Sequence, residues 1–164
     1  MPETERKTTP AAHRSTGGRL ICAGDLPLLH AFALALWQER ARERSEPVPE
    51  CLANSCKFTA LFVQALAGGT IRGNWQHVHV RLDSGSIVDL NSDAMDVRLL
   101  KLSGIDPYRH DRRFIASRDF KMSLASCNAR VKAWVADLKN QRATSWAEEL
   151  KALQRPMLGP NELT

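Results

Sequence analysis

The stretch that decides the fold lies between Ser55 and Asn91 and reads SCKFTALFVQALAGGTIRGNWQHVHVRLDSGSIVDLN. In its first part, apolar residues recur at intervals of three and four, at Phe58, Leu61, Phe62, Ala65 and Leu66. This spacing is typical of an amphipathic helix. Ser55 is a suitable N-cap, and Gly68-Gly69 can end the helix because glycine readily adopts the left-handed conformation of a helix C-terminus. The sequence therefore predicts a helix that starts at Cys56 and ends at this glycine pair.

In the second part of the stretch, apolar and polar residues alternate, as is typical of β-strands. Strand-like sequence covers residues 70–72, 75–82 and 87–91. Between the last two, residues 83–85 predict a tight hairpin loop with Gly85 in a left-handed conformation. Pairing Val80 with Val88 brings the apolar faces of both strands together, and a slip of one residue would turn every side chain to the other face. We therefore expect an antiparallel hairpin in this register.

This register gathers polar side chains on the opposite face of the hairpin. His79 would lie directly across from Asp89, while His77 would lie across from Asn91 and diagonal to Asp89. Diagonal neighbours on a sheet remain within reach of long side chains. We therefore expect both histidines to share a face with two groups that could orient an imidazole.

Cys56 occupies the first turn of the predicted helix, where unpaired N–H groups and the helix dipole stabilise a thiolate. A nucleophilic thiol also requires a base that reaches the sulfur and a third group that orients the base. The hairpin offers His77 or His79 as the base and Asp89 as the orienting group. These residues therefore predict a thiol-dependent catalyst.

Several segments of this stretch resemble the YunG-type family of small bacterial proteins. They are residues 56–64, 68–69, 77–82 and 88–90. They are similar, in order, to that family's Cys-initiated VTALLVQ helix, Gly-Gly, HYWNRL strand and DG…VDL hairpin. The resemblance covers roughly residues 51–91, a quarter of the chain. The same order, a Cys at a helix start, then a His and then an Asp on successive strands, is also similar to the wider transglutaminase-like pattern.

This resemblance implies a papain/transglutaminase-like fold. It also implies an enzyme that hydrolyses or transfers the acyl group of an amide in a protein or peptide-like substrate, without a cofactor. Alignment without gaps identifies His77 as the base and Asp89 as the carboxylate, whereas His79 falls where these families carry an aromatic residue. His79 and Asn91 would then support the site. Asn54 either donates to the oxyanion or only forms a turn.

Helices are predicted on both sides of this stretch. The first begins with Asp25 as N-cap and ends near Arg44, before the proline-containing residues 45–49. After Asp96 we expect a loop at residues 103–113, an extended Phe114-Ile115, a helix from Asp119 or Ser123 through Leu138, and a last helix at residues 145–153. With N-terminal helices, a small antiparallel sheet and C-terminal helices, the predicted class is α+β.

The composition is that of one soluble globular domain, predicted at residues 19–155, because 164 residues are hardly enough for two. Residues 1–18 are expected to form a disordered tail and residues 156–164 a second tail. The sequence contains no run of about 18 apolar residues and no apolar signal-peptide region. We therefore expect no membrane association and reduced cysteines in the cytoplasm, with export by a route that needs no N-terminal signal as the alternative.

Other interpretations of the same residues remain open. Cys56 could be a small buried hydrophobe, and Asp89 could simply solvate a strand face. A zinc site could group Cys51, Cys56, His77 and His79, but Cys-x4-Cys with His-x-His is not a strong zinc signature, so we expect no metal. The remaining cysteines, Cys22, Cys51 and Cys127, are expected to be structural.

The charge allows a rival function. With a net charge of +5, the chain could be a non-catalytic binding protein of the same fold that engages an acidic partner through the basic residues Arg109, Arg112 and Arg113. The other Lys and Arg residues are scattered, and the chain has a single Tyr. This pattern argues against nucleic-acid binding.

Overall fold

The computed structural model describes residues 25–153, with the side chains of residues 25–142. Its elements in chain order are α1 (Leu26–Glu43), α2 (Cys56–Ala67), β1 (Thr70–Gly73), β2 (Val78–Arg81), β3 (Ile87–Val88), α3 (Met95–Leu102), α4 (Arg112–Ala116) and α5 (Arg118–Leu153). The strands form one antiparallel sheet in the order β1-β2-β3. The predicted α+β class with a small antiparallel sheet is thereby confirmed. The tails predicted at residues 1–18 and 156–164 lie outside the described residues.

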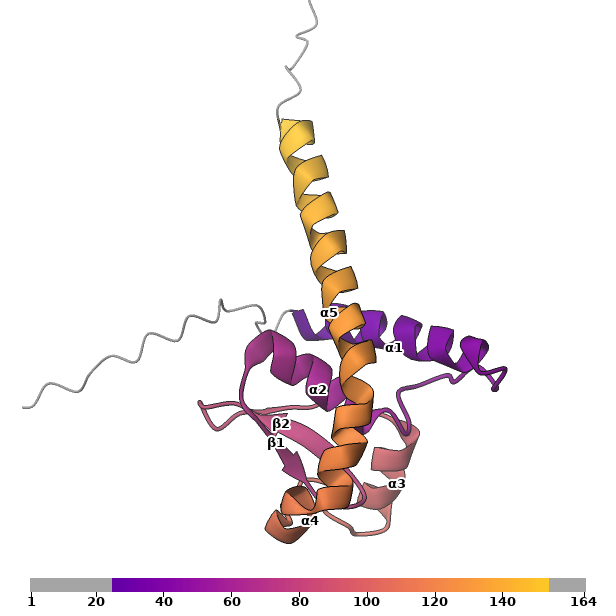
Figure 1. The fold of residues 1–164 in the computed structure, drawn as a ribbon, viewed down its shortest axis with the longest axis vertical. Helices are drawn as coiled ribbons and strands as arrows, with labels where there is room; N and C mark the ends of the chain where they lie inside the picture. The colour runs from indigo at the N-terminus through magenta and orange to yellow at the C-terminus, as the bar shows by residue number, and fades with distance from the viewer. Residues whose placement is uncertain (1–24, 154–164) are drawn as a thin grey trace, which may run out of the picture.

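Helix α2 lies between the sheet and the two long helices α1 and α5 (Figure 1). Its Phe62 is fully buried. The Phe62 ring stacks on Phe32 of α1 at a centroid distance of 5.9 Å and meets Trp134 of α5 edge-on at 6.2 Å. Val78 and Val80 of β2 belong to the same core. Because burying one side chain of this kind contributes about 1.5–3 kcal/mol, this packing fixes α2 relative to both layers.

The hairpin has the predicted register. Val80 pairs with Val88, and the Leu82 N–H donates to the Ser86 C=O at 2.9 Å. Gly85 has a φ of 88°, as the loop at residues 83–85 requires. The apolar faces meet in the core as expected, through Val78, Val80, Val88 and Leu90.

The second strand is shorter than predicted, because residues 74–77 form a turn. The Asn74 N–H donates to the His77 C=O at 2.9 Å, and the Asn74 Oδ1 accepts the N–H groups of Gln76 and His77. Trp75 lies in this turn with 74% of its surface exposed. The expectation of a strand from Trp75 was therefore wrong, since the Asn74 side chain offers the backbone an alternative to strand pairing.

The third strand ends at Val88, earlier than predicted. The Asp89 Oδ1 accepts the Asn91 N–H at 2.9 Å, and the Asn91 C=O accepts the Ala94 N–H at 2.9 Å. These local bonds turn the chain away from β2 after Val88. The expected pairing of the histidines with Asp89 and Asn91 across a ladder was therefore wrong.

The first two helices have the expected extents, but their predicted caps do not form. Asp25 and Ser55 occupy the N-cap positions of α1 and α2 without a side-chain capping bond. The Ser55 Oγ instead donates to the Leu52 C=O at 2.6 Å. Gly68, with a φ of 73°, ends α2 as expected.

The C-terminal half differs more from the predictions. Helix α3 was not expected at all. Phe114-Ile115 is helical in α4 rather than extended, because the Asp111 Oδ1 accepts the first N–H groups of that helix. The two predicted C-terminal helices are one helix, α5, since residues 139–144 contain neither glycine nor proline to break it. In the described part of the chain, no helix is long and apolar enough to cross a membrane.

Gly73 provides a test of the turn at residues 74–77. Its φ is 139°, and a Cβ there would clash with the carbonyl of His77. We expect Gly73→Ala to lower the free energy of unfolding, measured in urea, by on the order of 3 kcal/mol. Gly68→Ala is the control for backbone strain without a clash, because Gly68 has a φ of 73° and a ψ of −151° but a Cβ added there would meet no atom within 4 Å; it should cost on the order of 1–2 kcal/mol, less than Gly73→Ala. Equal losses in both variants would contradict the role assigned to Gly73.

Candidate active site

Cys56 is the first residue of α2, and its side chain is partly exposed. Helix geometry leaves the first N–H groups of α2 without intrahelical acceptors, so they are directed toward the start of the helix. The preceding loop is fixed to α3, since the Asn54 N–H donates to the Asp96 Oδ2 at 2.9 Å. Asn54 is exposed and has a φ of 63°. Its left-handed conformation fits the turn-forming role that the sequence offered as one of two alternatives.

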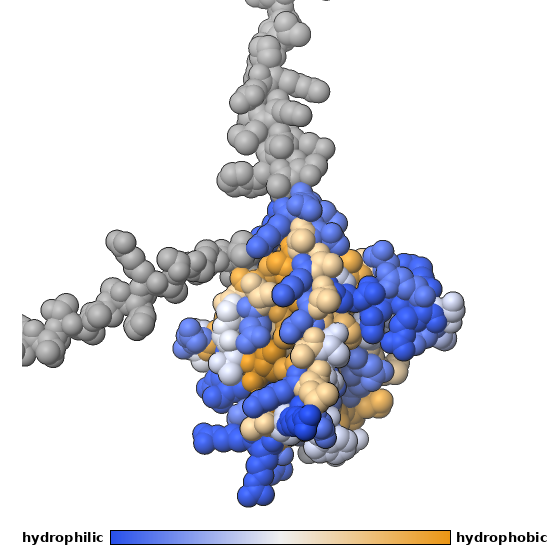
Figure 2. Space-filling view, viewed as in Figure 1, coloured by the Kyte–Doolittle hydropathy of each residue, from blue (hydrophilic) through white to orange (hydrophobic). Residues whose placement is uncertain are grey.

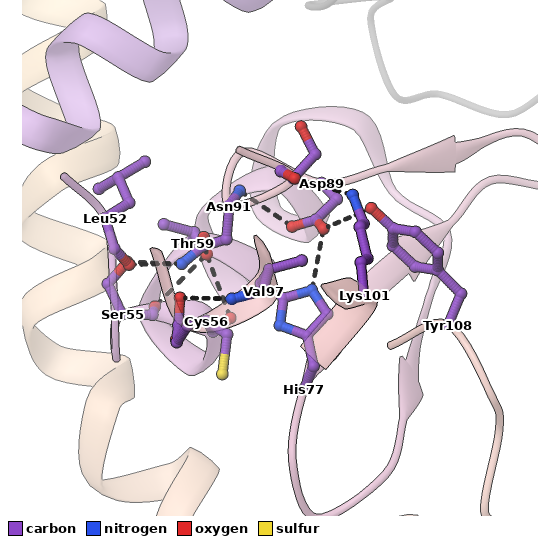
Figure 3. A network of polar contacts seen from close by, with 12 residues as sticks. Leu52, Ser55, Cys56, Thr59, His77, Asp89, Asn91, Val97, Lys101 and Tyr108 are labelled. Carbon is purple, nitrogen blue, oxygen red and sulfur yellow. Dashed lines mark hydrogen bonds and ion pairs between the residues drawn. The ribbon is translucent and has the colours of Figure 1, made fainter. Parts of the chain in front are cut away.

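His77 is almost completely buried, with 1% of its surface exposed. Its Nε2 lies 2.8 Å from the Asp89 Oδ2. Its Nδ1 is also buried and forms no hydrogen bond among the described residues. In Figure 3 the Nδ1 edge of the ring faces the side on which the Cys56 thiol lies. The ring thus has one nitrogen on a carboxylate and the other available on the side of the thiol.

The pKa of His77 reflects these neighbours. Burial lowers it, but the hydrogen bond to Asp89, the interaction with the Cys56 thiol and the charges of both groups outweigh burial. Together they raise the pKa of His77 from 6.5 to about 9. His77 is therefore protonated at neutral pH, and it is paired with Asp89.

Asp89 accepts three hydrogen bonds at a position where its side chain is only 4% exposed. Besides His77, the Tyr108 hydroxyl donates to its Oδ2 at 3.1 Å, and the Asn91 N–H donates to its Oδ1. Burial and the negative charge of Asp89 both raise the pKa of Tyr108, so this hydroxyl stays a donor. Sequence reasoning missed Tyr108; its only signal was that it is the single tyrosine of the chain.

His79 is a buried neighbour of His77. Its ring stacks on the His77 ring at a centroid distance of 6.3 Å and meets the Tyr108 ring edge-on at 5.2 Å. Burial lowers the pKa of His79, and the positive charge of His77 lowers it further. His79 is therefore neutral at pH 7. Of the two candidate bases, His77 is the one that contacts Asp89.

Asn91 lies away from the imidazole and supports the start of α2. It is fully buried. Its amide group donates to the Leu52 C=O at 2.6 Å and to the Ser55 Oγ at 3.0 Å, while its Oδ1 accepts the Thr59 hydroxyl at 2.5 Å. The expectation that Asn91 faces His77 was wrong, because the turn after Val88 directs Asn91 inward.

The zinc alternative lacks the required geometry. In the described part of the chain, which includes Cys51, Cys56, His77 and His79, no three His, Cys, Asp or Glu side chains come together in a way that could hold a metal ion. Cys127 is buried in α5, in line with a structural role.

Comparisons with protein-family models, with curated proteins and with solved structures find no match for this chain.

The raised pKa of His77 predicts the pH dependence of stability. Because the folded value of about 9 lies above the unfolded value of 6.5, the stabilisation is complete below about pH 6.5 and is lost as the pH rises through about 9. The shift corresponds to on the order of 3 kcal/mol. We expect the free energy of unfolding in urea to fall by about this amount between about pH 6.5 and 9.5.

Two carboxylate variants separate this effect from general charge effects. Asp89→Asn removes the charge that raises the pKa of His77, so the stability of this variant should depend much less on pH. Asp93→Asn removes a carboxylate whose side chain is 74% exposed, and it should retain the wild-type dependence. If the free energy of unfolding of Asp89→Asn depends on pH as strongly as that of the wild type, the His77–Asp89 pair is not the cause of the dependence.

The buried Asn91 network predicts a large loss of stability on truncation. Asn91→Ala leaves the Leu52 carbonyl and the Ser55 and Thr59 hydroxyls without this partner. A buried polar group without a partner costs about 1–3 kcal/mol, so we expect a loss of on the order of 3 kcal/mol in urea unfolding. Asn128→Ala on the exposed side of α5 is the control and should change stability by about 0.5 kcal/mol or less. Similar small effects in both variants would show that the network is not structural.

Proposed function

We propose that this chain is a thiol-dependent hydrolase or acyltransferase of the papain/transglutaminase-like kind, acting on an amide through Cys56, His77 and Asp89. The observation that carries the proposal is the orientation of His77. One ring nitrogen binds the buried Asp89 carboxylate at 2.8 Å, and the other has no hydrogen bond and faces the side of the thiol (Figure 3). A base that is oriented by a third group and is open toward a nucleophile is the arrangement thiol catalysis requires.

The chemistry follows from these positions. In the resting site His77 already holds, as an imidazolium, the proton given up by the Cys56 thiol, and the Cys56 thiolate attacks the carbonyl carbon of the amide. The C–N bond of the resulting tetrahedral intermediate then breaks, and the His77 imidazolium donates its proton to the departing amine. This leaves a thioester on Cys56. Water or an acceptor amine, deprotonated by His77, attacks the thioester and releases the acid or the new amide with the regenerated thiol.

The surrounding groups stabilise this cycle. The Cys56 N–H lies in the first turn of α2, where it has no intrahelical acceptor, and in this proposal it is one donor to the oxyanion. Asp89 holds the imidazole with Nε2 toward the carboxylate and stabilises the imidazolium. The Tyr108 hydroxyl and the Asn91 N–H keep the carboxylate in place. Asp89 is thus a positioning residue for His77.

The order of the elements supports the same family proposal. A cysteine opens α2, the histidine immediately precedes β2, and the carboxylate follows β3. This is the order of the papain/transglutaminase-like pattern and of the YunG-type family, to which we propose the chain is related. The rival function, a non-catalytic binding protein, would place Cys56 among apolar core side chains. Cys56 packs against the edge of the core but is partly exposed, and its thiol lies on the side of the His77 Nδ1 (Figure 3).

Alkylation tests the proposal without a substrate. An ordinary cysteine, with a pKa of ~8.5, reacts slowly with iodoacetamide at pH 6. We expect Cys56 to react at pH 6 at least about ten times faster than Cys51, because the helix start and His77 favour its thiolate. Cys51 is the internal control since it is also partly exposed, whereas the buried Cys127 should react last. Mass spectrometry of the modified peptides measures each rate.

Histidine variants distinguish the base from its neighbour. His77→Ala should shift the pH profile of Cys56 alkylation to higher pH, because the imidazolium that pairs with the thiolate is gone. His79→Ala removes a neutral ring and should change the rate by no more than about threefold. Circular dichroism should show that both variants fold. If Cys56 resists labelling, or if its alkylation rate has the same pH profile in His77→Ala as in the wild type, Cys56 is a packing residue and the enzyme proposal fails.

A further inference from the structure

A cavity of about 790 Å³ lies beside the candidate site. Residues 74–76 form one wall, and residues 104–106 and 109–113 form the other. The mechanism above uses none of these residues. The second wall includes the start of α4, and hydrophilic side chains project from the end of the molecule where α4 lies (Figures 1 and 2).

Both walls are fixed to the catalytic groups. The Asn74 side chain donates to the Arg109 C=O at 2.8 Å, and the Asp111 N–H donates to the Gly73 C=O at 2.8 Å. In the first wall, Gln76 directly precedes His77. In the second, Arg109 directly follows Tyr108, whose hydroxyl binds Asp89. Because consecutive Cα atoms lie about 3.8 Å apart, each wall of the cavity includes a residue next in the chain to a group of the candidate site.

The cavity offers unpaired positive charge. Arg109, Arg112 and Arg113 are exposed, and none of them forms an ion pair with another described residue. The two carboxylates in the walls already accept backbone hydrogen bonds, Asp106 from Tyr108 and Asp111 from the N–H groups that begin α4. The guanidinium groups are therefore the charged donors that remain available to a ligand.

The walls also include exposed apolar surface. Trp75 is 74% exposed and Ile105 is 39% exposed. An indole beside guanidinium groups suits the methylene and carboxylate parts of an acidic side chain, since arginine binds carboxylates through two parallel hydrogen bonds. With three arginines and two aspartates, the formal charge of these residues is only +1. This charge suits one or two carboxylates better than a polyphosphate backbone.

We propose that this cavity binds the carboxylate side chains of an acidic peptide substrate, next to the amide that Cys56 attacks. The inference rests on the proposed function and specifies its substrate class. The three guanidinium groups hold the carboxylates, Trp75 covers the adjacent methylene groups, and the shared turn at residues 74–77 places the following amide near His77.

Peptide binding tests the cavity independently of catalysis. The full-length Cys56→Ala variant lacks the nucleophile, and fluorescence polarisation measures its affinity for a labelled peptide of alternating glutamate and alanine. A peptide with glutamine in place of each glutamate is the comparison. We expect the acidic peptide to bind at least about tenfold more tightly, and we expect Arg109→Gln, Arg112→Gln and Arg113→Gln together to remove this preference. The matched control combines Arg42→Gln, Lys132→Gln and Lys139→Gln, which remove the same charge from exposed positions of α1 and α5; it should retain the preference.

A reactive peptide tests whether the cavity adjoins Cys56. The same acidic peptide carrying a terminal iodoacetamide should alkylate Cys56 of the wild-type chain at least about fivefold faster than its glutamine counterpart, and the cavity variant should lose this advantage. Equal binding of the two peptides, equal loss in the cavity and control variants, or binding without faster alkylation would each overturn the proposal. Tighter binding of a single-stranded oligonucleotide through the same arginines would overturn it as well. The proposed function itself is contradicted only if free iodoacetamide fails to label Cys56 ahead of Cys51, or labels it with a pH profile that His77→Ala does not change. The failure of the cavity proposal and the failure of the proposed function are therefore distinguishable.

Discussion

The buried carboxamide of Asn91 is the interaction on which the arrangement of the site depends. It joins the Leu52 carbonyl, the Ser55 hydroxyl and the Thr59 hydroxyl, and so connects the chain leaving β3 to the first turn of α2. This buried network fixes the start of α2, and with it Cys56, relative to Asp89 two residues earlier in the chain. A buried polar network of this kind is stable only when its members are satisfied, so it tolerates little displacement of the helix start.

A second constraint is electrostatic. The side chains of His77 and Asp89 are 1% and 4% exposed, so each ion would be costly to bury without its partner. The Tyr108 hydroxyl and the Asn91 N–H satisfy the remaining acceptor sites of the carboxylate. The pair therefore keeps the imidazole in one orientation and protonated at neutral pH. An oriented imidazolium beside a partly exposed thiol is the arrangement on which the proposed chemistry relies.

The same loops that complete the site also form the adjacent cavity. Tyr108, in the segment of residues 104–111, packs on both histidine rings, and this segment is bonded to Asn74 of the turn at residues 74–77 and to Gly73 at the end of β1. These connections are made by backbone and amide groups, which leaves the arginine side chains available. A ligand held in the cavity would therefore contact the two segments that position His77 and Asp89.

The sequence by itself determined the helix that begins at Cys56, the hairpin register of Val80 with Val88, and the α+β class, because these follow from local periodicity and turn chemistry. The register alone placed His79 nearest to Asp89, and only the family resemblance favoured His77; the tertiary structure places His77 against Asp89 and turns Asn91 into the core. Asn74 ends one strand with a side-chain hydrogen bond, and Asp89 ends the other; strand alternation carries no signal for either event. Tyr108 lies 19 residues from Asp89 and Asn91 lies 39 residues from Leu52. Contacts over such separations depend on how the loops pack, which the spacing of residues in one chain does not specify.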